Sequence, residues 1–225
     1  MLIQVAMTSW PNHPRRLEYF DRVTAALREK LTAGNHELHY VCSAETQRDP
    51  KQPWLGDPLQ ALCRQRGIAL TWRDAPASLG GNMNAALRLC TAPVIFLVQD
   101  DWLLLEPLNI GPGADYIAQH SDVDLIRYSW PGHMTRFLDA RDGWLTVDGS
   151  FQFSYGDDPQ LRRPDFVSRF GEYLEGGPHG VSEGDMLYRL RKRRATILAA
   201  PKNYFATIGE VASVIDEKRE RAVPR

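Results

Sequence analysis

Two adjacent aspartates, Asp100 and Asp101, follow Gln99 directly after an apolar run at residues 92–98. Adjacent carboxylates at the end of a buried strand repel each other and lose hydration unless a cation neutralises them. A hard divalent ion, Mn²⁺ or Mg²⁺, that also touches phosphate oxygens would do this and would stabilise a departing diphosphate. The alternative interpretation is a solvated turn that carries two exposed acids, so the position of the pair in the fold decides between them.

The elements that must position this pair alternate regularly over the first 102 residues. Apolar runs and helical spacing predict strands at residues 2–7, 37–42, 68–72 and 94–98, and helices at 16–31, 59–66 and 83–89. This order predicts an α/β fold with a mostly parallel central sheet and helices on both faces. Ligands of such sheets bind at the carboxyl ends of the strands, so the residues after each strand are the candidates for function.

The second half of the sequence is less regular. We expect a strand at residues 122–128, a hairpin around 144–153, helices at 164–170 and 184–194, and a short strand at 196–199. We therefore predict a single domain over residues 1–215. Residues 1–102 would form a regular half and residues 103–215 a smaller irregular half, with a charged flexible tail at 216–225.

Composition narrows the class of protein. The chain has 225 residues, 43% of them hydrophobic, and a formal net charge of -1. That charge gives no whole-molecule attraction to nucleic acid or to an anionic membrane. Three cysteines have neither metal nor redox spacing, which favours a reducing compartment. No apolar run approaches the roughly 20 residues of a membrane span, and no signal peptide is recognisable. We therefore expect a cytoplasmic protein without a membrane span.

A family resemblance is carried by residues 82–86 together with residues 94–101. This segment resembles glycosyltransferases of the GT-A fold, in particular the family-2-like inverting enzymes. They have an Asn-containing helix start, an apolar strand and an Asp-x-Asp-type motif, whose first acidic position is Gln99 here. The resemblance implies a UDP-sugar or related donor, Asp101 as the metal contact, and Asp100 facing the sugar or ribose and assisting at the metal. It also implies that residues 1–102 form the nucleotide-sugar-binding half and residues 103–215 the acceptor-side half.

The same resemblance implies a set of contacts to the nucleotide-sugar. They are Thr8, Arg16 (with Arg15 as its alternative), Ser43, Glu45, Gly80, Asn84, Gln99 and Asp100. Polar residues are also common after strands simply because loops are exposed, so polarity by itself favours no ligand.

The candidate general base lies in residues 182–190, which resemble the acidic segment that opens the acceptor-side helix of the family. Matching Arg189 to the family arginine puts Glu183 on the catalytic acid, and Asp185 is the second candidate. Such a carboxylate would take the proton of the attacking hydroxyl. The alternative is helix capping, because Ser182 and Asp185 have capping-box spacing and an acid suits a helix N-terminus. Thr207 stands where many relatives have a metal-binding His.

Acceptor contacts are expected from Trp130 and His179, against the alternatives of core packing and of a plain surface histidine. Residues 189–194 form a basic run, which is either a solvated helix face or a phosphate-binding surface. The acceptor is therefore a saccharide or, as the alternative, a hydroxylated base in DNA. The competing functions are a nucleotidyltransferase of related fold and an inactive nucleotide-sugar-binding module. Gln99 and Thr207 keep the inactive module open, because they stand where the family has an acid and a metal-binding His.

Overall fold

The computed structural model describes residues 1–46, 54–75, 78–130, 135–151, 153–176 and 180–209. The predicted tail at residues 216–225 and the predicted acceptor contact His179 lie outside these ranges. The described strands are β1 (Leu2–Ser9), β2 (Leu31–Thr32), β3 (Glu37–Glu45), β4 (Ile68–Arg73), β5 (Val94–Gln99), β6 (Trp102–Leu104), β7 (Leu108–Asn109), β8 (Leu125–Arg127), β9 (Phe137–Arg141), β10 (Trp144–Val147), β11 (Gln160–Arg162), β12 (Ile197–Ala199) and β13 (Phe205–Thr207). The described helices are α1 (Pro14–Lys30), α2 (Gly56–Gln65), α3 (Leu79–Arg88), α4 (Gly111–Gln119), α5 (Phe166–Phe170) and α6 (Val181–Lys192).

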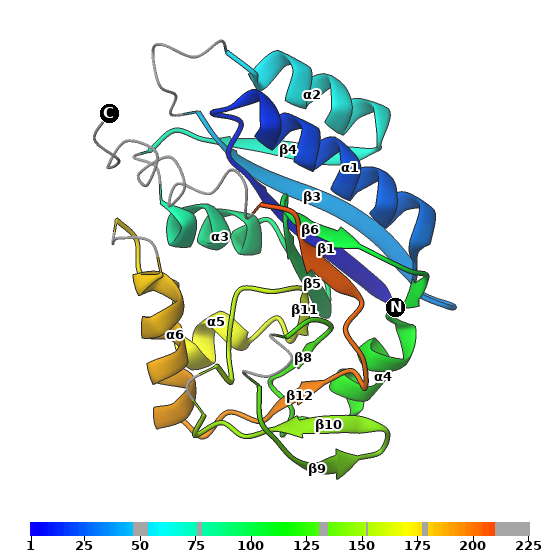
Figure 1. Cartoon of the computed structure of the whole chain (residues 1–225), viewed down its shortest axis with the longest axis vertical. Coiled ribbons are helices and arrows are strands. Elements are labelled where there is room, and N and C mark those ends of the chain that lie inside the picture. The colour runs from blue at the N-terminus through cyan, green and yellow to red at the C-terminus, as the bar shows by residue number, and fades with distance from the viewer. Residues whose placement is uncertain (47–53, 76–77, 131–134, 152, 177–179, 210–225) are drawn as a thin grey trace, which may run out of the picture.

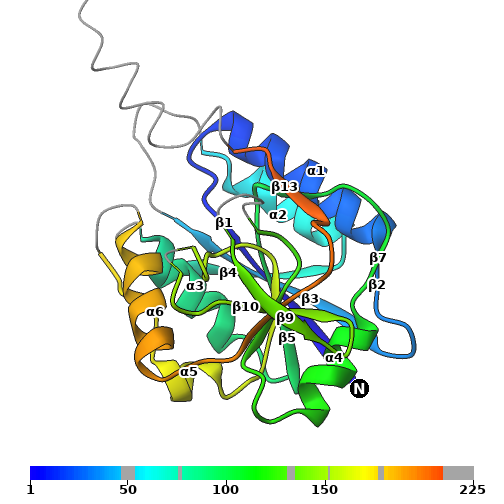
Figure 2. The ribbon, with the colours of Figure 1, turned by 60° about the horizontal axis from the view of Figure 1, so that its bottom comes forward.

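A nine-stranded sheet forms the centre of the described structure, in the order β4-β3-β1-β5-β11-β8-β12-β10-β9 (Figure 1). The first four strands in this order are parallel, while β11 runs antiparallel to both β5 and β8. β12 is parallel to β8, and the β9–β10 hairpin adds an antiparallel edge (Figure 2). The predicted fold class, a mostly parallel sheet with helices packed on it, is confirmed.

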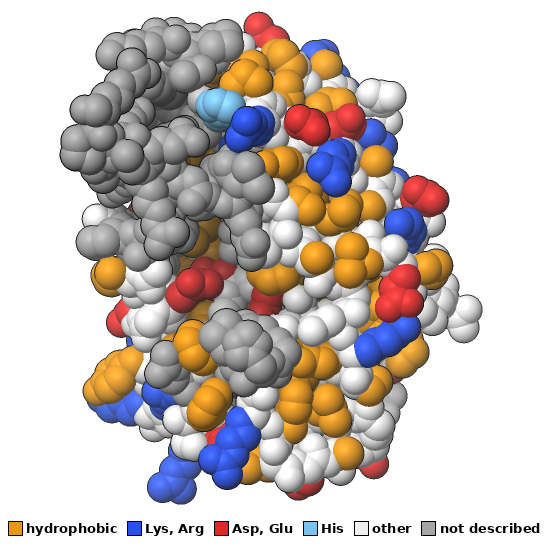
Figure 3. Space-filling model, in the orientation of Figure 1, with side chains coloured by type: hydrophobic (Ala, Val, Ile, Leu, Met, Phe, Trp, Pro, Cys, Tyr) orange, Lys and Arg blue, Asp and Glu red, His pale blue; other side chains and the backbone are white. Residues whose placement is uncertain are grey.

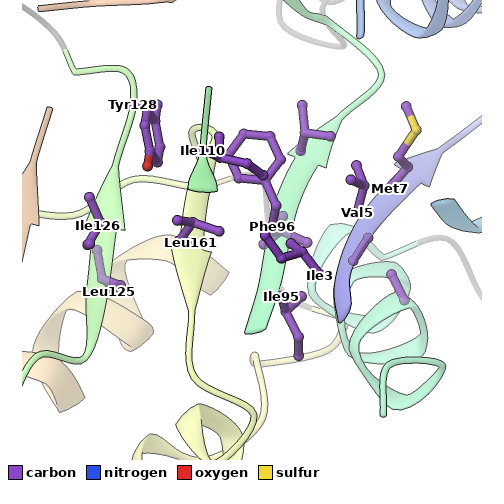
Figure 4. Close-up of a cluster of buried hydrophobic side chains, with 14 of the residues drawn as sticks. Ile3, Val5, Met7, Ile95, Phe96, Ile110, Leu125, Ile126, Tyr128 and Leu161 are labelled. Atoms are coloured by element: carbon purple, nitrogen blue, oxygen red, sulfur yellow. The ribbon is translucent and has the colours of Figure 1, made fainter. Parts of the chain in front are cut away.

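The core continues across the middle of this sheet. Apolar side chains of β1, β5, β11 and β8 lie side by side in Figure 4, among them Val5, Phe96, Leu161 and Ile126, all of them fully buried. Nearly continuous apolar runs such as the β5 sequence suit strands that are covered on both faces. The buried β5 strand therefore delivers Gln99 and the two aspartates to the edge of the sheet.

Two local expectations need correction. The hairpin is not centred in residues 144–153: β9 and β10 meet at Asp142 and Gly143, whose φ angles are 51° and 87°. Asp-Gly is the pair that favours a tight turn with positive φ at both positions, so the sequence carried this signal. Helix α6 also begins three residues before the predicted start at residue 184, which puts Glu183 in its first turn.

Cys42 and Cys63 are buried and Cys90 is partly buried, and all three are free thiols, as expected. Among the helices described, none combines the length and the apolar composition that crossing a bilayer would need.

Candidate active site

The carboxyl ends of three parallel strands bring predicted residues into one row. Thr8 of β1 is level with Ser43 of β3 on one side and with Gln99 of β5 on the other. At the outer strands, Glu45 is level with Arg73 of β4. The expectation that post-strand residues share one edge of the sheet is confirmed. In Figure 3, acidic side chains border a hollow near mid-height of the face shown.

Asp100 is buried and held on both carboxylate oxygens. Its Oδ2 accepts hydrogen bonds from the Ser9 hydroxyl (2.9 Å) and the Trp10 amide (3.4 Å), and its Oδ1 accepts from Arg16 (3.0 Å). Burial raises the pKa of Asp100, and the Arg16 guanidinium acts in the opposite direction. The solvated-turn interpretation is wrong for this residue.

Asp101 keeps an oxygen without a partner. Its Oδ2 lies 3.2 Å from Arg16 Nη1, whereas its Oδ1 is buried and has no hydrogen-bond partner within the described residues. A Cβ atom at Gly209 would lie 2.5 Å from Oδ2. The backbone carbonyl of Asp101 accepts from the Ile208 amide (2.8 Å). Residues 205–209 thus cover Asp101 closely, and only a glycine fits at position 209 without a shift.

Arg16 bridges the two aspartates from the first turn of α1. One nitrogen, Nη1, contacts both carboxylates, and the charge of Asp100 is the main reason why the pKa of Arg16 is raised. The sequence predicts that a metal ion alone neutralises the charges of the two aspartates. The structure supplies one positive charge from the protein itself, across 84 residues of sequence.

Ser43 and Glu45, the candidate contacts to the nucleoside, differ in the number of hydrogen bonds that they make within the protein. Ser43 is fully buried, and its hydroxyl has no partner in the described part of the chain. Glu45 accepts from the Ser78 amide (2.9 Å) and from Arg73 (3.3 Å), and burial raises its pKa. Glu45 therefore ties β3 to β4 and to the start of α3. Arg73 is a site residue that the sequence analysis missed.

Asn84 and Gly80 of α3 connect the two halves of the molecule. The Asn84 side chain exchanges hydrogen bonds with the backbone of Tyr173 (2.8 and 3.0 Å) and donates to Glu175 (3.0 Å). A Cβ at Gly80 would collide with the carbonyl oxygen of Leu174. Both residues thus hold the segment before α6 against α3, a joining role that the resemblance did not imply.

Glu183 is held at the same edge of the sheet as the aspartate pair. Its Oε1 accepts from the Asp157 amide (2.9 Å), and the Gln99 side chain donates to the Asp157 carbonyl (3.0 Å). The N-cap of α6 is Gly180, which has no side-chain capping bond. Glu183 therefore does not act as the cap, and the predicted capping box through Ser182 is not formed.

Asp185 is paired with Arg189 one turn further along α6, at 2.6 Å. Trp130 is nearly buried: its ring meets Phe137 edge-on, with centroids 5.5 Å apart, and its amide donates to Asn203. The packing interpretation thus fits Trp130 better than an open acceptor wall. The Thr207 hydroxyl oxygen accepts from the Gly209 amide (3.3 Å), within the strand that covers Asp101.

A buried charged cluster next to Glu183 was missed in the sequence. Asp157 accepts from the Tyr155 hydroxyl (3.0 Å), and burial followed by the charge of Glu183 raises the pKa of Asp157 to about 8. Asp158 is ion-paired with Arg127, and burial raises its pKa to about 6. A second Asp-Asp pair directly before a short strand was the available signal, but it lay in the irregular half.

Solved structures that resemble the chain include several of S. aureus TarS. S. aureus TarS 1–349 in complex with UDP-GlcNAc superposes with a TM-score of 0.64 at 13% identity, covering 91% of this chain and 58% of that one. The complex of TarS 1–349 with UDP gives 0.63 at 14% identity over 92% and 61%, and TarS itself gives 0.63 at 14% over 93% and 37%.

This chain has the GT-A fold. It spans less than two thirds of the length of these TarS chains. No family model and no curated protein matches it. Asp100 and Asp101 lie at the carboxyl end of the parallel strands, which is the edge at which open α/β sheets bind their ligands.

Within the described residues, no three His, Cys, Asp or Glu side chains group closely enough to hold a metal ion by themselves. The unpartnered Oδ1 of Asp101 is nevertheless a suitable single ligand, because hard divalent ions prefer carboxylate and phosphate oxygens. The donor set of this chain thus fits a metal that takes most of its ligands from a bound diphosphate.

Proposed function

We propose that the chain is a glycosyltransferase that moves a sugar from a nucleoside diphosphate sugar, a UDP-sugar in the first instance, to an acceptor hydroxyl with inversion. The GT-A fold supports it, and two of the similar TarS structures are complexes, one with UDP-GlcNAc and one with UDP. The observation that carries the proposal is the bridge from Gln99 through the Asp157 peptide to Glu183. It fixes a carboxylate beside the aspartate pair.

The transfer needs a base, because a hydroxyl is a weak nucleophile at neutral pH. In our proposal the acceptor oxygen attacks the anomeric carbon while the bond to the diphosphate oxygen breaks, and the diphosphate leaves with the electron pair. Glu183 takes the hydroxyl proton. Its Oε1 is held by the Asp157 amide, so Oε2 is the oxygen that we assign to the proton.

The departing diphosphate is the second requirement. A Mn²⁺ or Mg²⁺ ion on Asp101 Oδ1 and the phosphate oxygens would neutralise its charge. Arg16 contributes a fixed positive charge at the same place. In our proposal Asp100 can also contact the ribose or the metal. A carboxylate has about four lone-pair sites, and Asp100 accepts hydrogen bonds from the protein at three of them. Thr8, Ser43 and Glu45 would then face the nucleoside.

We propose a saccharide as the acceptor. The basic run at residues 189–194 is largely occupied with the protein itself: Arg189 donates to the carbonyl oxygens of Phe170 and Glu172, and Arg191 to those of Gly149 and Phe151. Guanidinium groups committed to backbone carbonyls offer fewer donors to phosphates. Tight binding of duplex DNA at low salt, measured by fluorescence anisotropy, would reverse this choice.

The test is release of nucleoside diphosphate from a panel of donor sugars and saccharide acceptors, with Mn²⁺, with Mg²⁺ and with a chelator. We expect turnover by the native chain and a drop of about 10²- to 10⁴-fold in Glu183→Gln. Asp185→Asn is the matched control and should stay within about tenfold, because Asp185 is paired with Arg189. Pyrophosphate release would identify a nucleotidyltransferase, and nucleotide binding without turnover an inactive module.

A further inference from the structure

A cavity of about 130 Å³ lies at the other end of the sheet from the aspartate pair. Ile95 lines it near the start of β5, four residues before Gln99, which corresponds to about 13 Å along a strand. Side chains alternate along β11: Leu161 packs toward α4, so Arg162 projects to the opposite face, where Phe166 of α5 also lines the cavity. The cavity is therefore separate from the proposed donor site.

Arg162 is the unusual residue of this cavity, because it is fully buried yet only partly bonded. Its Nη2 donates to the hydroxyls of Tyr155 (2.8 Å) and Tyr173. Its Nε and Nη1 have no partner within the described residues. Three N–H groups are thus left over on a side chain that is always charged. Buried donors without acceptors are rare in native proteins and point to a water or ion.

The charge of Arg162 is not balanced by the acids around it. The nearest acid, Asp157, has its pKa raised to about 8, mainly by burial, so it holds a proton at neutral pH. Asp158 is paired with Arg127. Aromatic faces take up part of the charge, with Phe166 centred 4.4 Å from the guanidinium carbon.

The remaining lining offers water little to bind. Glu172 is engaged by Arg88, and the Asn84 amide is engaged by Tyr173 and Glu175. A buried water needs two to four polar partners. An oxyanion would in addition offset the charge of the buried guanidinium, which a neutral water cannot do. Each free N–H group, on Nε or on Nη1, can donate a charge-assisted hydrogen bond to an oxygen of a carboxylate or phosphate. The volume suits a small ligand, since a cavity of about 150 Å³ accepts benzene.

We propose that the cavity between α3, α5 and the β5–β11 strands binds a small oxyanion, a carboxylate or phosphate group, through an N–H group of Arg162 that has no partner among the described residues. This site stands independently of the proposed transferase activity.

The first experiment needs no variant. Crystals of the native protein are soaked in sodium selenate, an anomalous scatterer with phosphate-like geometry, and separately in sodium acetate. We expect an anomalous peak, or acetate density, within hydrogen-bond distance of Arg162 Nε or Nη1. Ordered water alone at this position in both soaks would overturn the proposal.

The second experiment measures the melting temperature in sodium phosphate or sodium acetate against sodium chloride of equal ionic strength. A shift of about 3 °C or more is expected at a concentration about tenfold above Kd. Val167→Phe fills the cavity and should abolish the shift, whereas Ser168→Phe, its exposed neighbour outside the lining, should retain it. A response to phosphate only or to acetate only identifies the ligand class. An equal response in chloride, or one that survives in Val167→Phe, contradicts the site.

Discussion

The two halves of the sheet are built on different principles. In β4, β3, β1 and β5, charged residues stand only at or beyond the strand ends, and β5 leads directly to Asp100 and Asp101. In β11 and β8, the last residue of each short strand is a buried arginine, with Arg127 on Asp158 and Arg162 on two tyrosines. The first half is stabilised by apolar burial and the second depends on a polar network. They should therefore respond differently to mutation and to pH.

The largest expected effect is loss of the buried ion pair in the second half. Arg127→Met leaves Asp158 buried without its cation and removes donors from two backbone carbonyls. We expect a loss of about 3–5 kcal/mol of unfolding free energy at pH 8. The loss should shrink at pH 5, because Asp158, whose pKa is already about 6, can then take up a proton. Urea denaturation at the two pH values measures this, and an equal loss at both would contradict it.

The matching change in the first half removes apolar contacts only. Leu97 of β5 is fully buried, and Leu97→Ala should cost about 2–5 kcal/mol through lost transfer free energy and a residual cavity. No titratable group is removed, so the cost should be the same at pH 5 and pH 8. The same denaturation series tests this, and a strongly pH-dependent cost would erase the proposed difference between the halves.

Ionisation of Asp157 should have a smaller effect on stability, and this effect belongs to the second half of the sheet alone. The pKa of Asp157 is about 8 in the folded protein against an ordinary value of 3.8, so the folded state binds more protons between these values. Stability from this group is complete below about pH 4 and is lost as pH rises toward 8. Asp157→Asn should flatten the decline in melting temperature over this range, leaving the weaker contribution of Asp158. A variant with the slope of the native protein would show that Asp157 is ionised at neutral pH.

The smallest effect concerns two glycines in helices. A Cβ at Gly184 of α6 meets nothing within 4 Å, so Gly184→Ala should stabilise the protein by about 0.5–1 kcal/mol. Gly80→Ala is the contrast, because its Cβ would collide with the Leu174 carbonyl and force α3 away from the second half. Thermal unfolding of both variants tests the pair, and stabilisation by Gly80→Ala would mean that this joint is loose.

The sequence predicted the first half well because its signals are local. The strand that ends in Gln99 and the placement of Asp100 and Asp101 follow from one apolar run and the alternation of elements. The bridge from Arg16 was not predictable in this way, since it joins residues 84 positions apart through tertiary packing. Asp157 and Arg162 were missed for a related reason. Charged residues in short strands look like loop residues until the fold shows what buries them.

The short strand β13 affects the order in which parts of the molecule can fold during synthesis. Residues 205–209 pair with β6 and close over Asp101, although β6 follows the aspartates almost immediately in the chain. During synthesis, roughly a hundred further residues must leave the ribosome before the carbonyl of Asp101 meets the Ile208 amide. A nascent or proteolytically shortened chain that stops before residue 205 would keep the parallel strands β1, β3, β4 and β5 but lack this cover.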